Sequence, residues 1–307
     1  MCSSLLVLEF ISIPIPMMSS NVPDVYRYMA KDKEDYTVLE IPMGWVNSSF
    51  RNGVISNAAQ YYETVHGKRI FNGNAMRSRK DKILYYTDIP VIKSIIDLQD
   101  GKELKRSDID RDILLANDIF KYYNVRYILI HPPYNDERIV NYIKGVTRKD
   151  YEIKDGIVVF KLDPDEKQPG AGKGNRSDMW FGLGWYTVGM NGEQIFDRWS
   201  SNTESTLYLY LEKKSPCVLK LGMYPFPIGT SSQQVDVSLN GAYIGYLKLL
   251  PNSTVYNIPV SVSQENEGIN TITLKFKTIT GDTNKMVRPS FDQWSLGVAL
   301  NSMKIDR

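Results

Sequence analysis

The apolar positions along this chain follow two different spacings, and the change comes near residue 164. Before that point, short apolar runs alternate with segments in which apolar residues recur every three or four positions. The strongest run, Val125–Ile130, is typical of a buried strand, and an Asp155-Gly156 pair predicts a tight hairpin turn. This alternation predicts that residues 1–163 form an α/β domain with a partly parallel sheet.

The individual elements of this domain can be assigned from the same pattern. The expected strands lie at residues 5–11, 37–42, 125–130, 150–154 and 157–162, and the expected helices at 21–30, 57–65, 90–98, 112–123 and 136–144. Gly67 and Gly145 follow two of these helices and are predicted to end them, because glycine readily adopts the left-handed conformation of a helix end.

The second half has the texture of an all-β domain. Residues 164–178 are rich in glycine and proline and show no apolar period, which predicts a linker. From residue 179 to residue 307, apolar and polar residues alternate in at least seven short stretches, with turn signals such as Asn240-Gly241 between them. This pattern predicts an antiparallel β-sandwich of the jelly-roll type found in carbohydrate-binding modules.

Composition excludes several function classes. The 37 Lys and Arg residues nearly balance 35 Asp and Glu, and this net charge of +2 disfavours a nucleic-acid partner, since such proteins usually carry a basic face. Two cysteines and two histidines are too few for a disulfide scaffold or a typical zinc site. No catalytic motif of known spacing occurs. We therefore predict no catalytic residue, no metal and no cofactor in this chain.

The densest polar cluster of the first half follows the helix expected at 57–65. Its side chains could hold a phosphate or a glycan through guanidinium, ammonium and amide donors. They are His66, Lys68, Arg69, Asn72, Arg77 and Arg79. The alternative, which we favour, is a solvated basic loop after a helix. His66 could also act as a general base, but no carboxylate or nucleophile lies at motif spacing to orient it. His131 ends the strongest strand, where α/β folds place ligands, although a lone histidine there is more often structural.

Aromatic residues supply the second candidate site. Every tryptophan except Trp45 lies at or beyond Trp180. Trp185, Tyr186, Arg198 and Trp199 could form a platform on which a sugar ring stacks. The alternative, which we favour, is that these alternating aromatic side chains fill the core of the sandwich.

The N-terminus lacks the basic start and the cleavage site of a signal peptide. Its apolar run is interrupted by Glu9 and is shorter than the roughly 20 residues that span a bilayer. A chain that begins within a core strand is expected to be a piece of a longer protein.

Three segments of the first half carry a resemblance to a known family. They are Val-Leu-Glu-Ile-Pro at 38–42, Tyr-Tyr-Glu-Thr-Val-His-Gly-Lys-Arg-Ile at 61–70, and the strand that ends at His131. These segments are similar to the region after the last membrane helix of GT-C-type polytopic membrane glycosyltransferases. That group resembles dolichyl-phosphate-mannose protein mannosyltransferases and includes uncharacterised archaeal and bacterial relatives. Lys68-Arg69 departs from the usual Lys-Pro of the family.

The resemblance extends to the second half, which looks like the β-sandwich attached to some of these proteins. Gly-Trp-Tyr at 184–186, Arg-Trp at 198–199 and Asn240-Gly241 carry it. The catalytic acids of the family lie on its membrane portion and first outer loop, which this chain does not contain. The resemblance therefore implies a non-catalytic, extracytoplasmic domain pair, tethered by helices upstream of Met1, that engages a glycan or a lipid-linked sugar.

Two further hypotheses stay open at this point. The first is a free-standing carbohydrate-binding protein that uses its β-sandwich. The second is a soluble glycoside or ester hydrolase with an accessory jelly roll, for which the sequence offers no catalytic motif.

Overall fold

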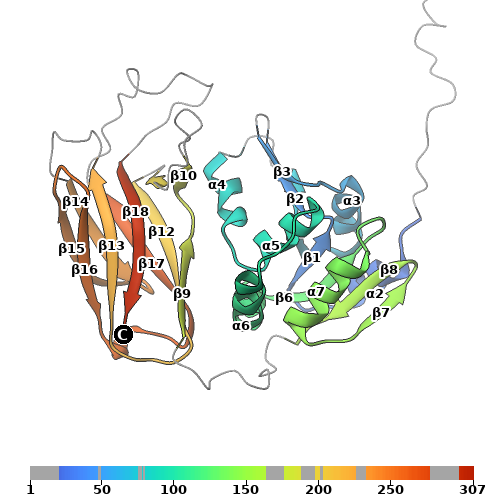
Figure 1. The fold of residues 1–307 in the computed structure, drawn as a ribbon. Coiled ribbons are helices and arrows are strands. Elements are labelled where there is room, and N and C mark those ends of the chain that lie inside the picture. Colours follow the sequence, from blue (N-terminus) through green and yellow to red (C-terminus); the bar gives the residue numbers. More distant parts are fainter. Residues whose placement is uncertain are drawn as a thin grey trace, which may run out of the picture.

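A computed structural model describes residues 21–47, 50–74, 78, 80–163, 176–187, 198–200, 203–225, 233–276 and 297–307. An α/β domain and a β-sandwich lie side by side (Figure 1). The predicted fold class is confirmed in both halves. The strand expected at 5–11 lies outside the described residues. Among the helices that are described, none is long and apolar enough to cross a membrane.

The α/β domain is built on a five-stranded sheet of mixed direction. Its strand order is β4-β1-β6-β8-β7. β1 (Thr37–Ile41) runs parallel to both β4 (Arg69–Ile70) and β6 (Val125–Ile130), while β8 (Ile157–Lys161) and β7 (Tyr151–Lys154) continue the sheet antiparallel. The hairpin turn between β7 and β8 is the predicted Asp-Gly pair, and both of its residues have positive φ.

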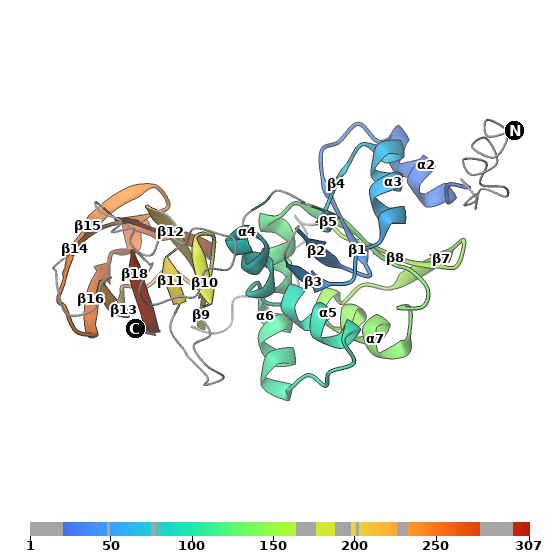
Figure 2. The same ribbon diagram turned by 90° about the horizontal axis from the view of Figure 1, so that it is seen from above.

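Helices cover both faces of this sheet (Figure 2). α2 (Asp24–Lys31) and α3 (Asn57–His66) cover the face that carries Val38 and Leu129. α5 (Ile92–Gln99), α6 (Arg106–Tyr122) and α7 (Glu137–Thr147) cover the opposite face, which carries Leu39 and Ile128. Because successive strand residues point to opposite faces, β1 and β6 are buried on both sides and are mostly apolar, while Thr37, Glu40 and Arg126 interrupt their apolar runs.

Two helix ends distinguish a correct prediction from a wrong one. Gly67 ends α3 in the left-handed conformation, with φ of 64°, as predicted. Gly145 does not end α7, which continues to Thr147 and stops where Arg148 adopts φ of 54°. Val146 and Thr147 are buried, and the Thr147 hydroxyl donates to the Ile143 carbonyl, so tertiary packing extends the helix past the glycine.

Several short elements were not predicted. A three-stranded sheet of order β3-β2-β5 joins β2 (Gly44–Val46), β3 (Arg51–Gly53) and β5 (Gly73–Asn74), and α4 (Lys80–Leu84) leads into the 3-10 helix η1 (Tyr85–Thr87). Elements of two to five residues are too short to show a period of apolar positions. α6 also begins at Arg106, six residues before its expected start at 112, because its first turn is polar.

The second domain is a sandwich of two antiparallel five-stranded sheets. Sheet I has the order β15-β14-β17-β12-β9, and sheet II has the order β10-β11-β18-β13-β16. The strands of sheet I are β9 (Ser177–Phe181), β12 (Glu204–Leu211), β14 (Gln233–Leu239), β15 (Ala242–Leu249) and β17 (Gly268–Phe276). Those of sheet II are β10 (Trp185–Thr187), β11 (Arg198–Ser200), β13 (Cys217–Pro225), β16 (Thr254–Val260) and β18 (Val298–Asp306). β9 starts two residues before the predicted boundary at 179, because Ser177 and Asp178 already pair with β12.

The two domains share one apolar core. Trp180, Tyr208 and Tyr210 on the outer face of sheet I belong to the same buried cluster as the side chains between α5, α6 and α7. The Tyr208 ring lies 5.5 Å from that of Tyr122 in α6 and 6.2 Å from that of Tyr85 in η1. Sheet I is therefore covered on its inner face by sheet II and on part of its outer face by the α/β domain.

Candidate functional site

A buried polar cluster lies at the carboxyl ends of β1 and β6. Glu40 is fully buried, and its carboxylate accepts hydrogen bonds from the Tyr26 hydroxyl at 3.0 Å and from Nε2 of His131 at 2.6 Å. The Tyr26 hydroxyl also lies 2.9 Å from Nε2 of His131. Burial, with Glu40 beside it, raises the pKa of Tyr26 well above its ordinary value, so this hydroxyl keeps its proton. A buried carboxylate is thus satisfied by two donors from different elements.

Aromatic rings extend this cluster toward α3. The Tyr62 ring stacks on Tyr26 at 4.3 Å between centroids, and the His66 ring lies 5.6 Å from Tyr26 on nearly parallel planes. Burial and then the nearby Lys68 lower the pKa of His66 to about 4, so its imidazole is neutral at pH 7. We call Tyr26, Glu40, Tyr62, His66 and His131 the Glu40 cluster.

The rest of the predicted basic loop is dispersed. The Lys68 ammonium is buried and donates to the carbonyls of Asp32 and Glu34 at 2.5 and 2.6 Å. Arg69 is exposed and pairs with Asp35. Asn72 is buried and donates to the Pro42 carbonyl at 3.0 Å.

The four residues of that loop that the structure describes therefore do not gather into one site. Lys68 and Asn72 hydrogen-bond to backbone carbonyls before and after β1. Of the four described residues, His66 alone belongs to the Glu40 cluster. Arg77 and Arg79 lie outside the described residues.

The predicted aromatic platform of the sandwich is also dispersed. Trp185 is 2% exposed within the core between the two sheets, and its indole N–H donates to the Thr206 carbonyl at 2.7 Å. Tyr186 and Trp199 are buried in a small separate cluster. The Arg198 guanidinium forms an ion pair with Asp88 of the α/β domain at 2.8 Å. The tryptophan rings serve packing, so a sugar cannot stack on their faces in this structure.

Exposed aromatic rings occur elsewhere on the sandwich. Tyr243 and Tyr246, both on β15, are 60% and 62% exposed. They pair with Ser238 and Asp236 of β14, whose neighbours Val235, Val237 and Leu239 are buried in the sandwich core. Because paired residues point to the same face, both tyrosines project from the outer face of sheet I.

A β-bulge is what brings these two tyrosines to one face. Residues three positions apart on a regular strand point to opposite faces. Here the register shifts between Val237 and Ser238, so that β15 carries one extra residue between Tyr243 and Tyr246. Gly245 sits at this shift with φ of 146°, a conformation that other residues rarely adopt. Beside the tyrosines, the Gln234 amide donates to Asp236 at 2.8 Å.

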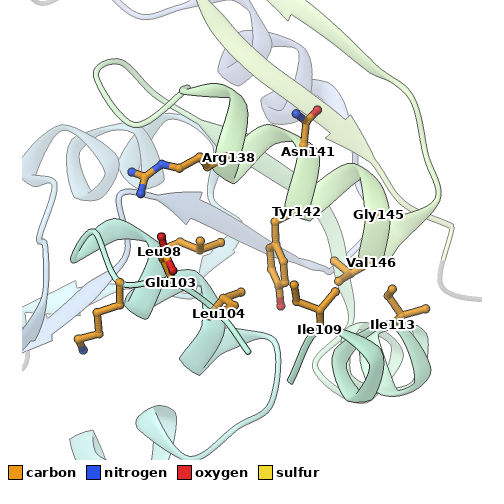
Figure 3. A pocket seen from close by; sticks show the side chains of 11 residues that line it. Leu98, Glu103, Leu104, Ile109, Ile113, Arg138, Asn141, Tyr142, Gly145 and Val146 are labelled. Carbon is orange, nitrogen blue, oxygen red and sulfur yellow. The ribbon is translucent and has the colours of Figure 1, made fainter. Parts of the chain in front are cut away.

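Figure 3 shows a different hollow, between α5, α6 and α7, with a volume of about 460 Å³. Its walls are mostly apolar, with Leu104, Ile109 and Val146 among them, and Tyr142 of α7 also lines it. The Tyr142 hydroxyl donates to the buried Asp112 at 2.8 Å. Of the predicted ligand contacts that the structure describes, none lines this hollow.

Within the described part of the chain, no three histidine, cysteine or acidic side chains come together as metal ligands do. Of the groupings that the structure describes, the Glu40 cluster and the tyrosine pair of β15 are partly open to solvent. Sequence reasoning missed Tyr26, Glu40 and the tyrosine pair as site residues. The signal available for the pair was Gly245, since a glycine inside an alternating strand marks a bulge.

Comparison with known proteins gives matches among solved structures alone. No protein-family profile matches the chain, and no curated protein matches it. A family 35 carbohydrate-binding module from an environmental isolate is 14% identical, with a TM-score of 0.24, over 34% of this chain and 65% of that one. A family 35 module from Clostridium thermocellum is 12% identical, with a TM-score of 0.25, over 42% and 90%.

A third match is the CBM36-1 domain of a multidomain xylanase from the hindgut metagenome of Trinervitermes trinervoides. It is 14% identical, with a TM-score of 0.25, and the match covers 43% of this chain and 98% of that domain. With identities of 14% or lower and TM-scores of 0.25 or lower, these matches assign no binding residue to this chain.

Proposed function

We propose that this chain engages a glycan through the open part of sheet I, the outer face of β14 and β15. The observation that carries the proposal is the bulge at Gly245, which aligns Tyr243 and Tyr246 on one exposed face. A regular strand would turn one of these rings into the sandwich core.

The chemistry of this face suits a neutral saccharide. A sugar ring presents an apolar C–H face and a rim of hydroxyl groups. Exposed tyrosine rings offer a flat apolar surface for the first, and the carboxylate of Asp236 and the amide of Gln234 offer an acceptor and a donor for the second. Lys248 projects from the same face and pairs with Gln234, so the surface carries both signs of charge and gives no preference for an anionic polymer.

Glycan binding can be measured on a printed array of neutral oligosaccharides, followed by calorimetric titration with the best binder. We expect Tyr243→Ala and Tyr246→Ala each to weaken the affinity about tenfold, which corresponds to about 1.4 kcal/mol. Tyr28→Ala is the matched control, because Tyr28 is equally exposed but lies on α2 of the other domain. A double variant that binds as tightly as the natural chain would refute the proposal, and so would a natural chain that binds no saccharide.

The wider context that we propose is an extracytoplasmic domain pair of a membrane glycosyltransferase-like protein, which presents a glycan or a lipid-linked sugar. The support is that the three segments that resemble this family, residues 38–42, residues 61–70 and the strand that ends at His131, meet in space. Glu40, His66 and His131 come from the three separate segments and form one cluster. Hydrophobic helices encoded upstream of Met1 would agree with this context, and a reading frame closed directly before Met1 would contradict it.

A further inference from the structure

Two nitrogen atoms of the Glu40 cluster have no hydrogen-bond partner among the described residues. Nδ1 of His66 accepts from the Lys68 backbone amide at 2.9 Å, so the proton of this neutral ring is on Nε2. That Nε2–H is buried, and it donates to no described atom. His66 as a whole is only 4% exposed, and leaving such a buried donor unpaired destabilises the fold.

The second atom belongs to His131. Its Nε2 lies 2.6 Å from a Glu40 oxygen and donates to that carboxylate, so Nδ1 is the acceptor atom of the neutral tautomer with this contact. No hydrogen bond within the described part of the chain uses this Nδ1. The His131 side chain is 17% exposed, and Tyr62 is also partly exposed, so these two residues form the solvent-facing side of the cluster.

We propose that the Glu40 cluster is a second ligand site, which takes a neutral ligand with several hydroxyl groups. Such a ligand accepts a hydrogen bond from Nε2–H of His66 and donates one to Nδ1 of His131. A hydroxyl group is both donor and acceptor, so one kind of group satisfies both vacant positions. The Tyr62 ring, stacked on Tyr26, supplies an apolar surface for the carbon skeleton.

Charged ligands fit this site poorly. An anion would approach the buried carboxylate of Glu40, while, among the described residues beside the cluster, His66 is neutral and Lys68 donates to two backbone carbonyls. A cation would meet a carboxylate whose oxygens already accept from Tyr26 and His131, beside an outward N–H of His66. A neutral ligand avoids both costs.

The chain offers a direct probe, because its only two histidines both belong to this cluster. The experiment is a titration of histidine-labelled protein with neutral methyl glycosides, followed through the imidazole nitrogen signals in NMR spectra, with inorganic phosphate as the charged comparison. We expect both histidines to shift with the glycosides and neither to shift with phosphate. An absence of shifts, or equal shifts with phosphate, would overturn the proposal.

Variants separate this site from the tyrosine pair of the sandwich. The Tyr243→Ala/Tyr246→Ala double variant lacks the proposed glycan surface of the sandwich. We expect its histidine NMR signals to shift with glycosides as they do in the natural chain. His66→Gln keeps an N–H donor near the position of Nε2, whereas His66→Phe removes it, so glycoside affinity, measured from the remaining His131 signal, should drop at least tenfold only in the phenylalanine variant. Equal affinity of these two variants would overturn the role of His66. Thermal unfolding of each variant confirms that the fold is retained.

Tyr62 gives a second measurement that does not alter buried polar atoms. Tyr62→Ala should weaken glycoside binding about fivefold, while Tyr61→Ala, the exposed neighbour on the same helix, should leave it unchanged. Equal effects of the two substitutions would contradict the proposed place of the ligand.

Discussion

The outer face of sheet I is aromatic at both of its ends, yet the two ends differ in what covers them. At the β9–β12 end, Trp180 and Tyr208 pack beneath α6 and η1 and belong to the core of the α/β domain. At the β14–β15 end, Tyr243 and Tyr246 project into solvent. Residue type is nearly the same at both ends, so the neighbouring element decides whether an aromatic side chain stabilises the fold or remains available to a ligand.

The largest effect is expected at the covered end. Tyr208→Ala removes a buried ring that contacts Trp180, Tyr85 and Tyr122, and it should lower the free energy of unfolding by about 3–4 kcal/mol. Urea unfolding measures this value, with Tyr246→Ala as the matched substitution at the open end. A loss below about 1 kcal/mol for Tyr208→Ala would show that the two ends are equally open in solution.

The ion pair at the border of the covered end comes next. Asp88 directly follows η1 and Arg198 lies on β11, and both side chains are mostly buried. Arg198→Met leaves the Asp88 carboxylate without its cation and should lower the free energy of unfolding by about 1–3 kcal/mol. A cycle with Asp88→Asn separates the pair energy from the individual losses. If the energy losses of the two single variants add up to that of the double variant, the ion pair does not stabilise the contact between the domains.

The same carboxyl group gives a pH dependence of known sign. Burial raises the pKa of Asp88 above its ordinary value, although Arg198 opposes the shift. The folded state then binds the Asp88 proton more tightly than the unfolded state, so the contribution of this group to stability falls as pH rises from about 4 through the raised pKa. Unfolding curves at a series of pH values should show this slope in the natural chain and a smaller one in Asp88→Asn. An unchanged slope would assign it to other groups.

A comparable effect is expected at the bulge of the open end. Gly245→Val forces a side chain into φ of 146° and should cost about 1–3 kcal/mol in unfolding free energy. It should also weaken glycan binding, since the bulge sets the alignment of Tyr243 and Tyr246. Gly145→Ala is a useful control because its Cβ meets no atom within 4 Å and it lies inside a helix, where alanine should stabilise by about 0.5–1 kcal/mol.

The smallest effect is expected for the exposed rings themselves. The Tyr243→Ala/Tyr246→Ala double variant should change the unfolding free energy by less than about 0.5 kcal/mol per substitution, because both side chains are mostly exposed. Chemical denaturation beside the binding assay checks it. A large loss of stability would mean that these rings have a structural role and would remove the contrast between the two ends.

Much of the fold could be predicted from the sequence, because long elements carry a clear period of apolar residues. The run 125–130 and the alternating strands of the sandwich are examples. Short elements such as β5 and η1 could not be predicted, since two or three residues show no period. Gly145 was misjudged because burial of Val146 overrides a local preference for ending the helix.

The candidate sites were harder to predict, for a physical reason. His66 was chosen for its chemistry, but its ring partner Tyr26, which donates to Glu40, lies 40 residues away and meets it only because α2 packs against α3. Trp185 was chosen for its ring, and burial in the sandwich core removes it from solvent. Sequence shows which groups exist, whereas exposure depends on contacts distant along the chain.

The apolar core that the two domains have in common bears on how the protein can be handled in the laboratory. A sandwich expressed alone would expose Trp180, Tyr208 and Tyr210 to water as one apolar patch. The α/β domain alone would likewise expose the apolar side chains that pack against these rings. Cutting the gene between the halves is thus expected to yield two aggregating products. Replacing those three rings with serine or lysine on the isolated sandwich is the way to obtain a tractable fragment for ligand screening.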